Sequence, residues 1–210
     1  MTDPTAARIL ATALQAFDEK GLQGVTTAEI CRRAAVSNGS LFHHFGSKDG
    51  IVGALYLSGI RAYQEAMRAA LQAGIEPEAA VHAAVAAHQD WAEAEPVLAR
   101  FLFDCARPGW PGLRSAEIEA ENARFRRHLA DWAAPHRATG RLLDLPVEVI
   151  AAQLIGPIQI FTRAWLSGRS AAPPARGPDG PLHALQAAAW RALRGPHADA
   201  TEPGRRNGND

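Results

Sequence analysis

Helical periodicity along nearly the whole chain is the feature that most constrains its fold. Apolar residues recur at intervals of three and four, Ala, Leu, Glu and Arg dominate, and runs of β-branched residues are nearly absent. Hydrophobic residues make up 47% of the 210 residues, so the chain is able to bury a packed core. An all-α fold is therefore predicted, and no internal repeat is visible.

Capping signals divide the first part of the chain into short helices. Thr26 and Glu29 have the spacing of a capping box, Ser37 and Ser47 are good N-cap residues, and Gly46 is a good helix end. The helices expected here cover residues 4–21, 27–34, 38–45 and 48 into the low seventies. Three short helices followed by a long one predict a separate N-terminal unit over residues 1–50.

The remainder of the chain is expected to form a larger helical body over residues 51–194. Its expected helices cover residues 78–91, a segment that begins at 96, and residues 113–134, 147–168 and 182–194. A break is expected at residues 108–112 and a Pro- and Gly-rich loop at 170–181. Residues 195–210 carry few apolar side chains and are expected to be a disordered tail.

Composition sets limits on the class of protein. The formal net charge is zero, with 22 basic and 22 acidic residues, which neither supports nor excludes nucleic-acid binding. Cys31 and Cys105 lie far apart, so neither a disulfide scaffold nor a zinc site is indicated. No uninterrupted run of roughly 18 apolar residues occurs, so no membrane partner is expected. The N-terminus does not resemble a signal peptide, and the expected compartment is the cytoplasm.

The expected helices at residues 27–34 and 38–45, joined by a tight turn, form a helix-turn-helix arrangement. In this motif the second helix enters the major groove of DNA, and its leading residues meet base edges. Asn38 and Ser40 place short polar side chains at that end, and asparagine pairs with adenine edges. Gly39 costs about 1 kcal/mol of helix stability, and close approach of the backbone to DNA would explain its presence.

Polar and basic side chains follow this leading end. His43 and His44 offer hydrogen-bonding groups, and Lys48 combines a cation with the free N–H groups of a helix start, which together bind phosphate. A plainer interpretation stays open, in which Ser37 is only a cap and the histidines lie on a solvated face. Taken together, these residues and their spacing favour sequence-specific DNA binding. A metal site is not predicted, because neighbouring residues on a helix point about 100° apart and no second ligand pair is in view.

The segment TTAEICRRAAVSNGSLFHHFGSKDGI closely resembles the DNA-binding signature of the TetR family of bacterial repressors. The resemblance covers about residues 8–55, and the rest is similar only in length and helical layout. It implies a two-domain, all-α homodimer that binds a roughly palindromic double-stranded DNA operator and is released by a small-molecule effector. Position by position, it implies phosphate contacts from Thr27, His43, His44 and Lys48, and base or groove contacts from Asn38, Gly39 and Ser40.

Two positions depart from the family pattern. Ala35 stands where glycine is common in the turn, and a left-handed conformation there would strain alanine mildly. Phe42 stands where tyrosine is frequent, so one phosphate contact from a hydroxyl is lost. The candidate DNA-binding residues are therefore Thr27, Ser37, Asn38, Gly39, Ser40, Phe42, His43, His44 and Lys48.

The larger helical body is expected to hold a dimer contact and an effector site. Residues 147–167 and 182–194 suit either a four-helix contact with their symmetry mates or an intramolecular core, and the resemblance favours the homodimer. Candidate effector contacts are large aromatic side chains and polar handles, although such aromatic residues are more often plain core. These candidates are Trp91, Phe101, Phe103, Trp110, Phe125, Trp132, Gln153, Gln159, Phe161 and Trp165.

No catalytic residue, cofactor or metal is predicted. The chain has no G-x-S-x-G, P-loop, H-E-x-x-H or G-x-G-x-x-G motif, and His82 and His88 lie on different helix faces. A more serious alternative to a repressor is a helical ligand-binding or adaptor dimer without sequence-specific DNA binding. Only Arg32, Arg33 and Lys48 are cations near the motif, which keeps this alternative open.

The sequence thus predicts a DNA-binding transcriptional regulator, most simply a repressor. Residues 1–50 would be its helix-turn-helix DNA-binding domain, and residues 51–194 its helical effector-binding and dimerisation domain. Residues 195–210 would form the tail.

Overall fold

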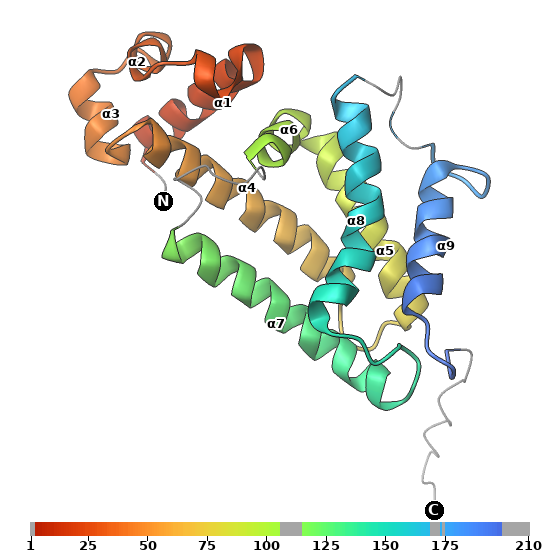
Figure 1. Ribbon diagram of the computed structural model, residues 1–210. Coiled ribbons are helices and arrows are strands. Elements are labelled where there is room, and N and C mark those ends of the chain that lie inside the picture. The colour runs from red at the N-terminus through yellow and green to blue at the C-terminus, as the bar shows by residue number, and fades with distance from the viewer. Residues whose placement is uncertain (1–2, 106–114, 169–172, 174, 199–210) are drawn as a thin grey trace, which may run out of the picture.

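The computed structural model describes residues 3–105, 115–168, 173 and 175–198, and over these residues the chain forms helices without a strand. The all-α prediction is confirmed (Figure 1). The helices of the described residues are α1 (Pro4–Gly24), α2 (Thr27–Ala34), α3 (Asn38–Phe45), α4 (Lys48–Ala70), α5 (Pro77–Ala94), α6 (Pro96–Cys105), α7 (Ala116–Ala138), α8 (Val147–Leu166) and α9 (Pro181–Leu193).

Hydroxyl side chains begin three of the first four helices, because each accepts a hydrogen bond from a backbone N–H of the first turn. Thr26 Oγ1 accepts from the Glu29 N–H at 3.2 Å, and Ser37 Oγ accepts from the Ser40 N–H at 3.0 Å. Ser47 caps α4 in the same way, at 3.1 Å. The predicted starts of α2, α3 and α4 are confirmed.

α1 is longer than predicted. The predicted end at Gly21 has φ 71° and ψ 162°, but the helix resumes beyond it and ends at Gly24. Glycine adopts this positive φ without a Cβ clash, so Gly21 kinks α1 rather than ending it. Gly46, with φ 69°, ends α3 as predicted. The helices of the larger body differ from prediction by a few residues at their ends, where terminal turns are least well determined by sequence.

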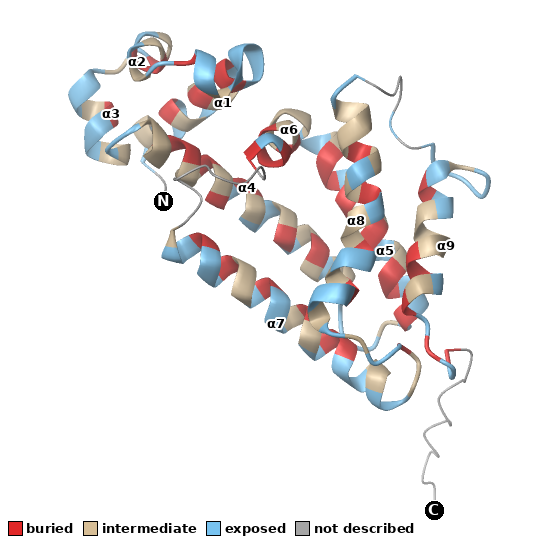
Figure 2. Cartoon of the chain, in the orientation of Figure 1, coloured by how far each residue is buried: buried red, intermediate tan, exposed pale blue. Residues whose placement is uncertain are grey.

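Two cores organise the helices, and α4 contributes to both. The first core lies among α1, α2, α3, α6, the N-terminal half of α4 and the C-terminal end of α5, and includes Leu41 and Ile51. The second lies among α5, α7, α8, α9 and the C-terminal half of α4, and includes Met67 and Leu129. Figure 1 shows α4 running from the α1–α3 group into the larger helical body, with buried residues along its length in Figure 2. α4 is therefore the structural connection between the two parts.

The first residues of the predicted tail are ordered. The Gly195 N–H donates to Arg141 O at 2.9 Å, and the His197 N–H donates to Gly140 O at 2.9 Å. Ala198 is buried. Residues 195–198 thus pack against the connection between α7 and α8, which the sequence pattern did not predict. The predicted break at 108–112 and residues 199–210 of the predicted tail lie outside the described residues.

α8 presents an uncovered apolar face. Its inner face buries Ile150, Leu154 and Ile158, whereas Ile160 is 74% exposed and Val149 is 37% exposed. Of the helices in the described part of the chain, α8 alone is long and apolar enough to cross a membrane by length and composition, with a mean hydropathy of 1.3. One such helix does not by itself indicate a membrane span, because core helices of soluble proteins can be equally long and apolar. Polar residues interrupt the run, which is why the sequence shows no continuous apolar stretch there.

Candidate nucleic-acid interface and ligand cavity

A left-handed residue forms the turn between α2 and α3. Ala35 has φ 52° and ψ 48°, and it is the one non-glycine residue with a positive φ in the described chain. The Val36 N–H donates to Cys31 O at 3.1 Å and closes the end of α2. Leu41 is fully buried and fixes α3 in the first core. The α2–α3 pair is therefore a helix-turn-helix, with strain at the position where the sequence departs from glycine.

Ala35→Gly is expected to raise the free energy of unfolding by about 1 kcal/mol. A Cβ in the left-handed region costs roughly 1–2 kcal/mol, and the larger entropy of glycine in the unfolded chain offsets part of the gain. Urea denaturation measures the difference. Ala28→Gly, at an exposed helical position of α2, is the matched control and should lower stability by about 1 kcal/mol. Equal losses in both variants would show that Ala35 is unstrained.

The leading end of α3 is open to solvent. Asn38 and Gly39 are exposed and Ser40 is half-buried, while Ser37 caps the helix. A Cβ added at Gly39 would meet Ser37 Oγ at 3.8 Å, which is an ordinary contact. The backbone at Gly39 is helical, so neither conformation nor packing within the described chain requires glycine here.

The trailing end of α3 is only partly free. Phe42 is 50% exposed and His43 is exposed, but His44 is half-buried, with its Nε2 3.8 Å from Asp3 Oδ2. The Thr5 backbone N–H, and to a lesser extent the nearby His44, hold the pKa of Asp3 below its ordinary value. A phosphate that approaches His44 would therefore compete with the Asp3 carboxylate.

Lys48 holds the end of α1 as well as beginning α4. Its Nζ donates to Leu22 O at 2.9 Å and to Val25 O at 3.1 Å. An ammonium has three N–H donors, so one remains for an external acceptor. Sequence reasoning missed the two carbonyl partners because they lie 26 and 23 residues away along the chain. Thr27, at the start of α2, is half-buried.

The two arginines of α2 differ in their partners. Arg33 pairs with Glu19 at 2.7 Å and with Glu29 at 2.8 Å. Arg32 is exposed and makes no ion pair with any described residue. The Glu29 carboxylate does not bond the Thr26 N–H in the described structure, so the predicted capping box forms on its threonine side only. Free positive charge near the motif is therefore sparse.

A cavity of about 110 Å³ lies among α4, α5, α6 and α8. The predicted candidates Trp91, Phe103 and Gln159 line it. Its other lining residues were not among the candidates, because their helical spacing is that of ordinary core positions. These residues are Tyr56, Ile60, Tyr63, His88, Leu102 and Ile155.

The other predicted effector contacts are not among the residues that line this cavity. Phe101 stacks on Phe17 in the first core, with ring centroids 6.0 Å apart. Phe125 and Trp132 belong to the second core. The remaining candidates are half-buried on α8 (Phe161 and Trp165), exposed on α8 (Gln153) or outside the described residues (Trp110).

Tyr63 and His88 form a polar pair in the lining of the cavity. Tyr63 Oη lies 3.1 Å from His88 Nδ1. Burial lowers the pKa of His88 to about 4 and raises the pKa of Tyr63 far above its ordinary value. Both side chains are therefore uncharged near pH 7.

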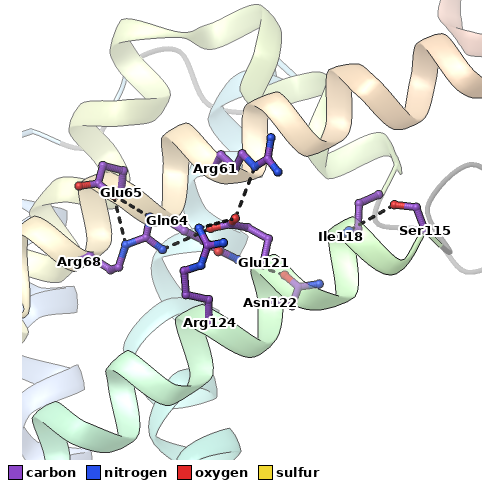
Figure 3. Close-up of polar contacts among 9 residues, drawn as sticks. All are labelled: Arg61, Gln64, Glu65, Arg68, Ser115, Ile118, Glu121, Asn122 and Arg124. Carbon is purple, nitrogen blue, oxygen red and sulfur yellow. Dashed lines mark hydrogen bonds and ion pairs between the residues drawn. The ribbon is translucent and has the colours of Figure 1, made fainter. Parts of the chain in front are cut away.

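A buried carboxylate joins α7 to α4 (Figure 3). Glu121, on α7, is 1% exposed. Its Oε2 lies 3.4 Å from Arg61 Nε, and its Oε1 lies 3.4 Å from Arg68 Nη1, both on α4. Arg124, one turn along α7, lies 3.1 Å from Oε2. The C-terminal half of α4 is thus fixed to α7 by charge as well as by packing.

Residues 9–55 match the family model described as bacterial regulatory proteins, tetR family. The HTH-type transcriptional regulator BetI of Paraburkholderia phytofirmans is 33% identical over 91 residues, which are 43% of this chain and 47% of that protein. The chain spans about half the length of the curated relatives it matches. Residues 9–55 contain the α2–α3 pair described above.

Solved structures share the fold over most of the chain. A bacterial regulatory protein in the tetR family from Rhodococcus RHA1 superposes with a TM-score of 0.74 at 20% identity, over 92% of this chain and 99% of that one. FadR from Bacillus subtilis, solved in complex with stearoyl-CoA, has a TM-score of 0.69 at 15% identity, over 88% and 95% of the two chains. At these identities the likeness shows the fold alone.

Proposed function

The chain is a member of the TetR family of bacterial regulatory proteins, and on that premise we propose that it is a cytoplasmic transcriptional repressor. It binds a roughly palindromic operator as a homodimer and leaves it when a small-molecule effector binds. The observation that carries this proposal is the exposed leading end of α3, where neither conformation nor packing within the described chain requires a glycine at position 39. Close approach of this backbone to the major groove would require one.

The exposed and half-buried residues of the motif divide into two roles. Asn38, Gly39 and Ser40 lie against base edges, with Ser37 fixing the helix start that presents them. Thr27, His43, His44 and Lys48 contact phosphates, and Phe42 adds an apolar contact. His44 exchanges Asp3 for a phosphate when DNA binds, and Lys48 uses its third N–H.

The homodimer forms through the outer faces of α8 and α9. Their inner faces pack within the chain, as Ile158 and Leu182 show, so each helix has a second face to offer. A four-helix contact with the partner copy would cover Ile160 and Val149. Such a dimer presents two α3 helices roughly 34–36 Å apart, one turn of duplex.

Effector release acts through α4. Tyr56 and Tyr63 of α4 line the cavity, and Ile51 of the same helix packs in the core that holds α3. A ligand that favours a shifted α4 therefore favours a spacing of the two α3 helices that no longer fits the operator.

Fluorescence anisotropy against a duplex from the protein's own upstream region tests DNA recognition. A scrambled duplex is the control, and both are titrated at two salt concentrations. Specific binding whose affinity falls with salt supports the regulator, because neutralised phosphates release counterions.

Gly39→Ala separates the fold from DNA binding. The added Cβ meets only Ser37 Oγ at 3.8 Å, so the free energy of unfolding should rise by about 0.5–1 kcal/mol. Affinity for the specific duplex should nevertheless fall by roughly tenfold or more, because the methyl group blocks backbone approach to base edges. Denaturation and anisotropy on the same preparation measure both effects. Undiminished affinity would remove Gly39 from the interface.

The alternative is a helical ligand-binding or adaptor dimer that does not read DNA. The internal partners of Arg33, Lys48 and His44 favour it, because they occupy charge that phosphates would otherwise use. Equal, weak binding to the specific and scrambled duplexes would support this alternative and contradict the repressor.

A further inference from the structure

Two buried nitrogen atoms on one face of α5 lack hydrogen-bond partners. His88 is 1% exposed and Trp91 is 8% exposed, and their spacing of three places them on the same face. Both residues line the 110 Å³ cavity. Neither His88 Nε2 nor Trp91 Nε1 bonds any described residue. Because an unpaired buried polar atom is destabilising, a ligand that accepts hydrogen bonds from this pair would gain affinity.

Tyr63 determines which proton His88 carries. Its hydroxyl lies 3.1 Å from His88 Nδ1 and has no other acceptor among the described residues. The best-satisfied arrangement has Tyr63 donating to Nδ1, so the neutral imidazole carries its proton on Nε2. His88 Nε2–H and Trp91 Nε1–H are then two hydrogen-bond donors at one cavity, and neither has an acceptor among the described residues.

The walls of the cavity exclude a charged ligand. No carboxylate, lysine or arginine is among the lining residues, so a charged group would find no counter-charge there. Burial lowers the pKa of His88 to about 4, which leaves the ring uncharged at pH 7. Tyr63 and Trp91 have ring centroids 5.2 Å apart, and His88 stacks on Phe103 at 6.2 Å. These aromatic faces suit a compact apolar body.

Size completes the description of the ligand. A closed cavity of about 150 Å³ in another protein holds benzene. The present cavity is smaller, about 110 Å³, but it is partly open to solvent, so it suits one small ring rather than a long acyl chain. We propose that this cavity binds an uncharged, ring-sized molecule whose carbonyl oxygen accepts hydrogen bonds from His88 Nε2 and Trp91 Nε1. That such a molecule acts as the effector rests on the proposed function, whereas its binding does not.

Three probes of one shape test the proposal on the full chain: cyclohexanone, methylcyclohexane and cyclohexylammonium. Nitrogen-15 NMR follows the indole N–H resonances, and Trp91→Phe identifies the Trp91 signal by its loss. Cyclohexanone should move this signal downfield in a saturable way, as expected for a new acceptor. It should also bind about tenfold more tightly than methylcyclohexane, which corresponds to a net gain of one good hydrogen bond.

Trp91→Phe supplies the matched variant, because it removes one donor and keeps an aromatic wall. Affinity for cyclohexanone should fall about tenfold, while affinity for methylcyclohexane should stay unchanged. The proposal is overturned if the ketone and the hydrocarbon bind equally, if cyclohexylammonium binds most tightly, or if cyclohexanone leaves the wild-type Trp91 signal unmoved.

The operator duplex separates this proposal from the function on which its biological role rests. Saturable cyclohexanone binding that shifts the Trp91 signal supports the ligand class, whether or not the duplex is released. Failure of release at saturation would contradict the effector role alone.

Discussion

Glu121→Gln is expected to lower the free energy of unfolding by about 2–3 kcal/mol, because a buried ion pair loses one of its charges. Glu121 and Arg68 have side chains that are only 1% and 18% exposed, so water screens their interaction little. Arg61 and Arg124 are more than half exposed and can turn into solvent when the carboxylate is neutralised. Arg68 keeps Glu65 as a partner, which holds the loss below that of a fully buried pair. Urea denaturation followed by circular dichroism measures it.

Glu65→Gln is the matched control for Glu121→Gln. Glu65 binds the same Arg68, at 2.6 Å, but its side chain is 72% exposed. Its loss should therefore cost less than about 1 kcal/mol. If the two variants lose equal stability, burial of Glu121 adds nothing, and the α4–α7 connection depends on packing and on the hydrogen bond from Gln64 to Asn122.

Local chemistry made the N-terminal part of this fold predictable. The caps at Thr26, Ser37 and Ser47 act within one turn of their own helices, so their spacing in the sequence is the spacing of the bond. The left-handed Ala35 follows from the same local geometry, because the turn needs a residue that ends α2 abruptly. The starts of α2, α3 and α4 and the helix-turn-helix arrangement could therefore be predicted from sequence, whereas the end of α1 could not.

Contacts between distant segments were not predictable in the same way. The apolar composition of residues 96–105 indicates a buried helix, but not that Phe101 stacks on Phe17 while Phe103 lines the cavity. From the sequence alone Lys48 is a free cation, because nothing in the sequence indicates that its ammonium lies beside the carbonyl oxygens of Leu22 and Val25. Which of the sequence-based candidates touch DNA or an effector stays a prediction.

One missed feature did leave a signal in the sequence. Glu121 lies three residues after Ile118 and four before Phe125, which places a carboxylate on the apolar face of α7. An ionised group on such a face needs partners, and arginines at positions 61 and 68 of α4 supply them. A charged residue on the apolar face of a helix therefore predicts an ion pair with a neighbouring helix.

Stability is expected to fall as the pH drops from 6.5 towards 4, because His88 is uncharged in the folded state. Burial lowers its pKa from the ordinary 6.5 to about 4, so the unfolded chain binds a proton that the folded chain excludes. The contribution of His88 is fully present above pH 6.5 and is lost progressively below it. The total loss is about 3 kcal/mol, since each pKa unit corresponds to about 1.4 kcal/mol.

His88→Gln isolates this effect, because glutamine keeps a polar group and does not titrate. Tyr63 from α4 is the titratable group that faces His88, and it stays protonated over this range because burial raises its pKa. α6 contributes Phe103 and α8 contributes Ile155 and Gln159 to the same cavity, and none of them carries a charge. His82 and the carboxylates titrate in both proteins and cancel in the comparison. The wild type should therefore lose about 3 kcal/mol relative to the variant between pH 6.5 and 4. Parallel curves would mean that folded His88 takes up a proton as readily as the unfolded chain.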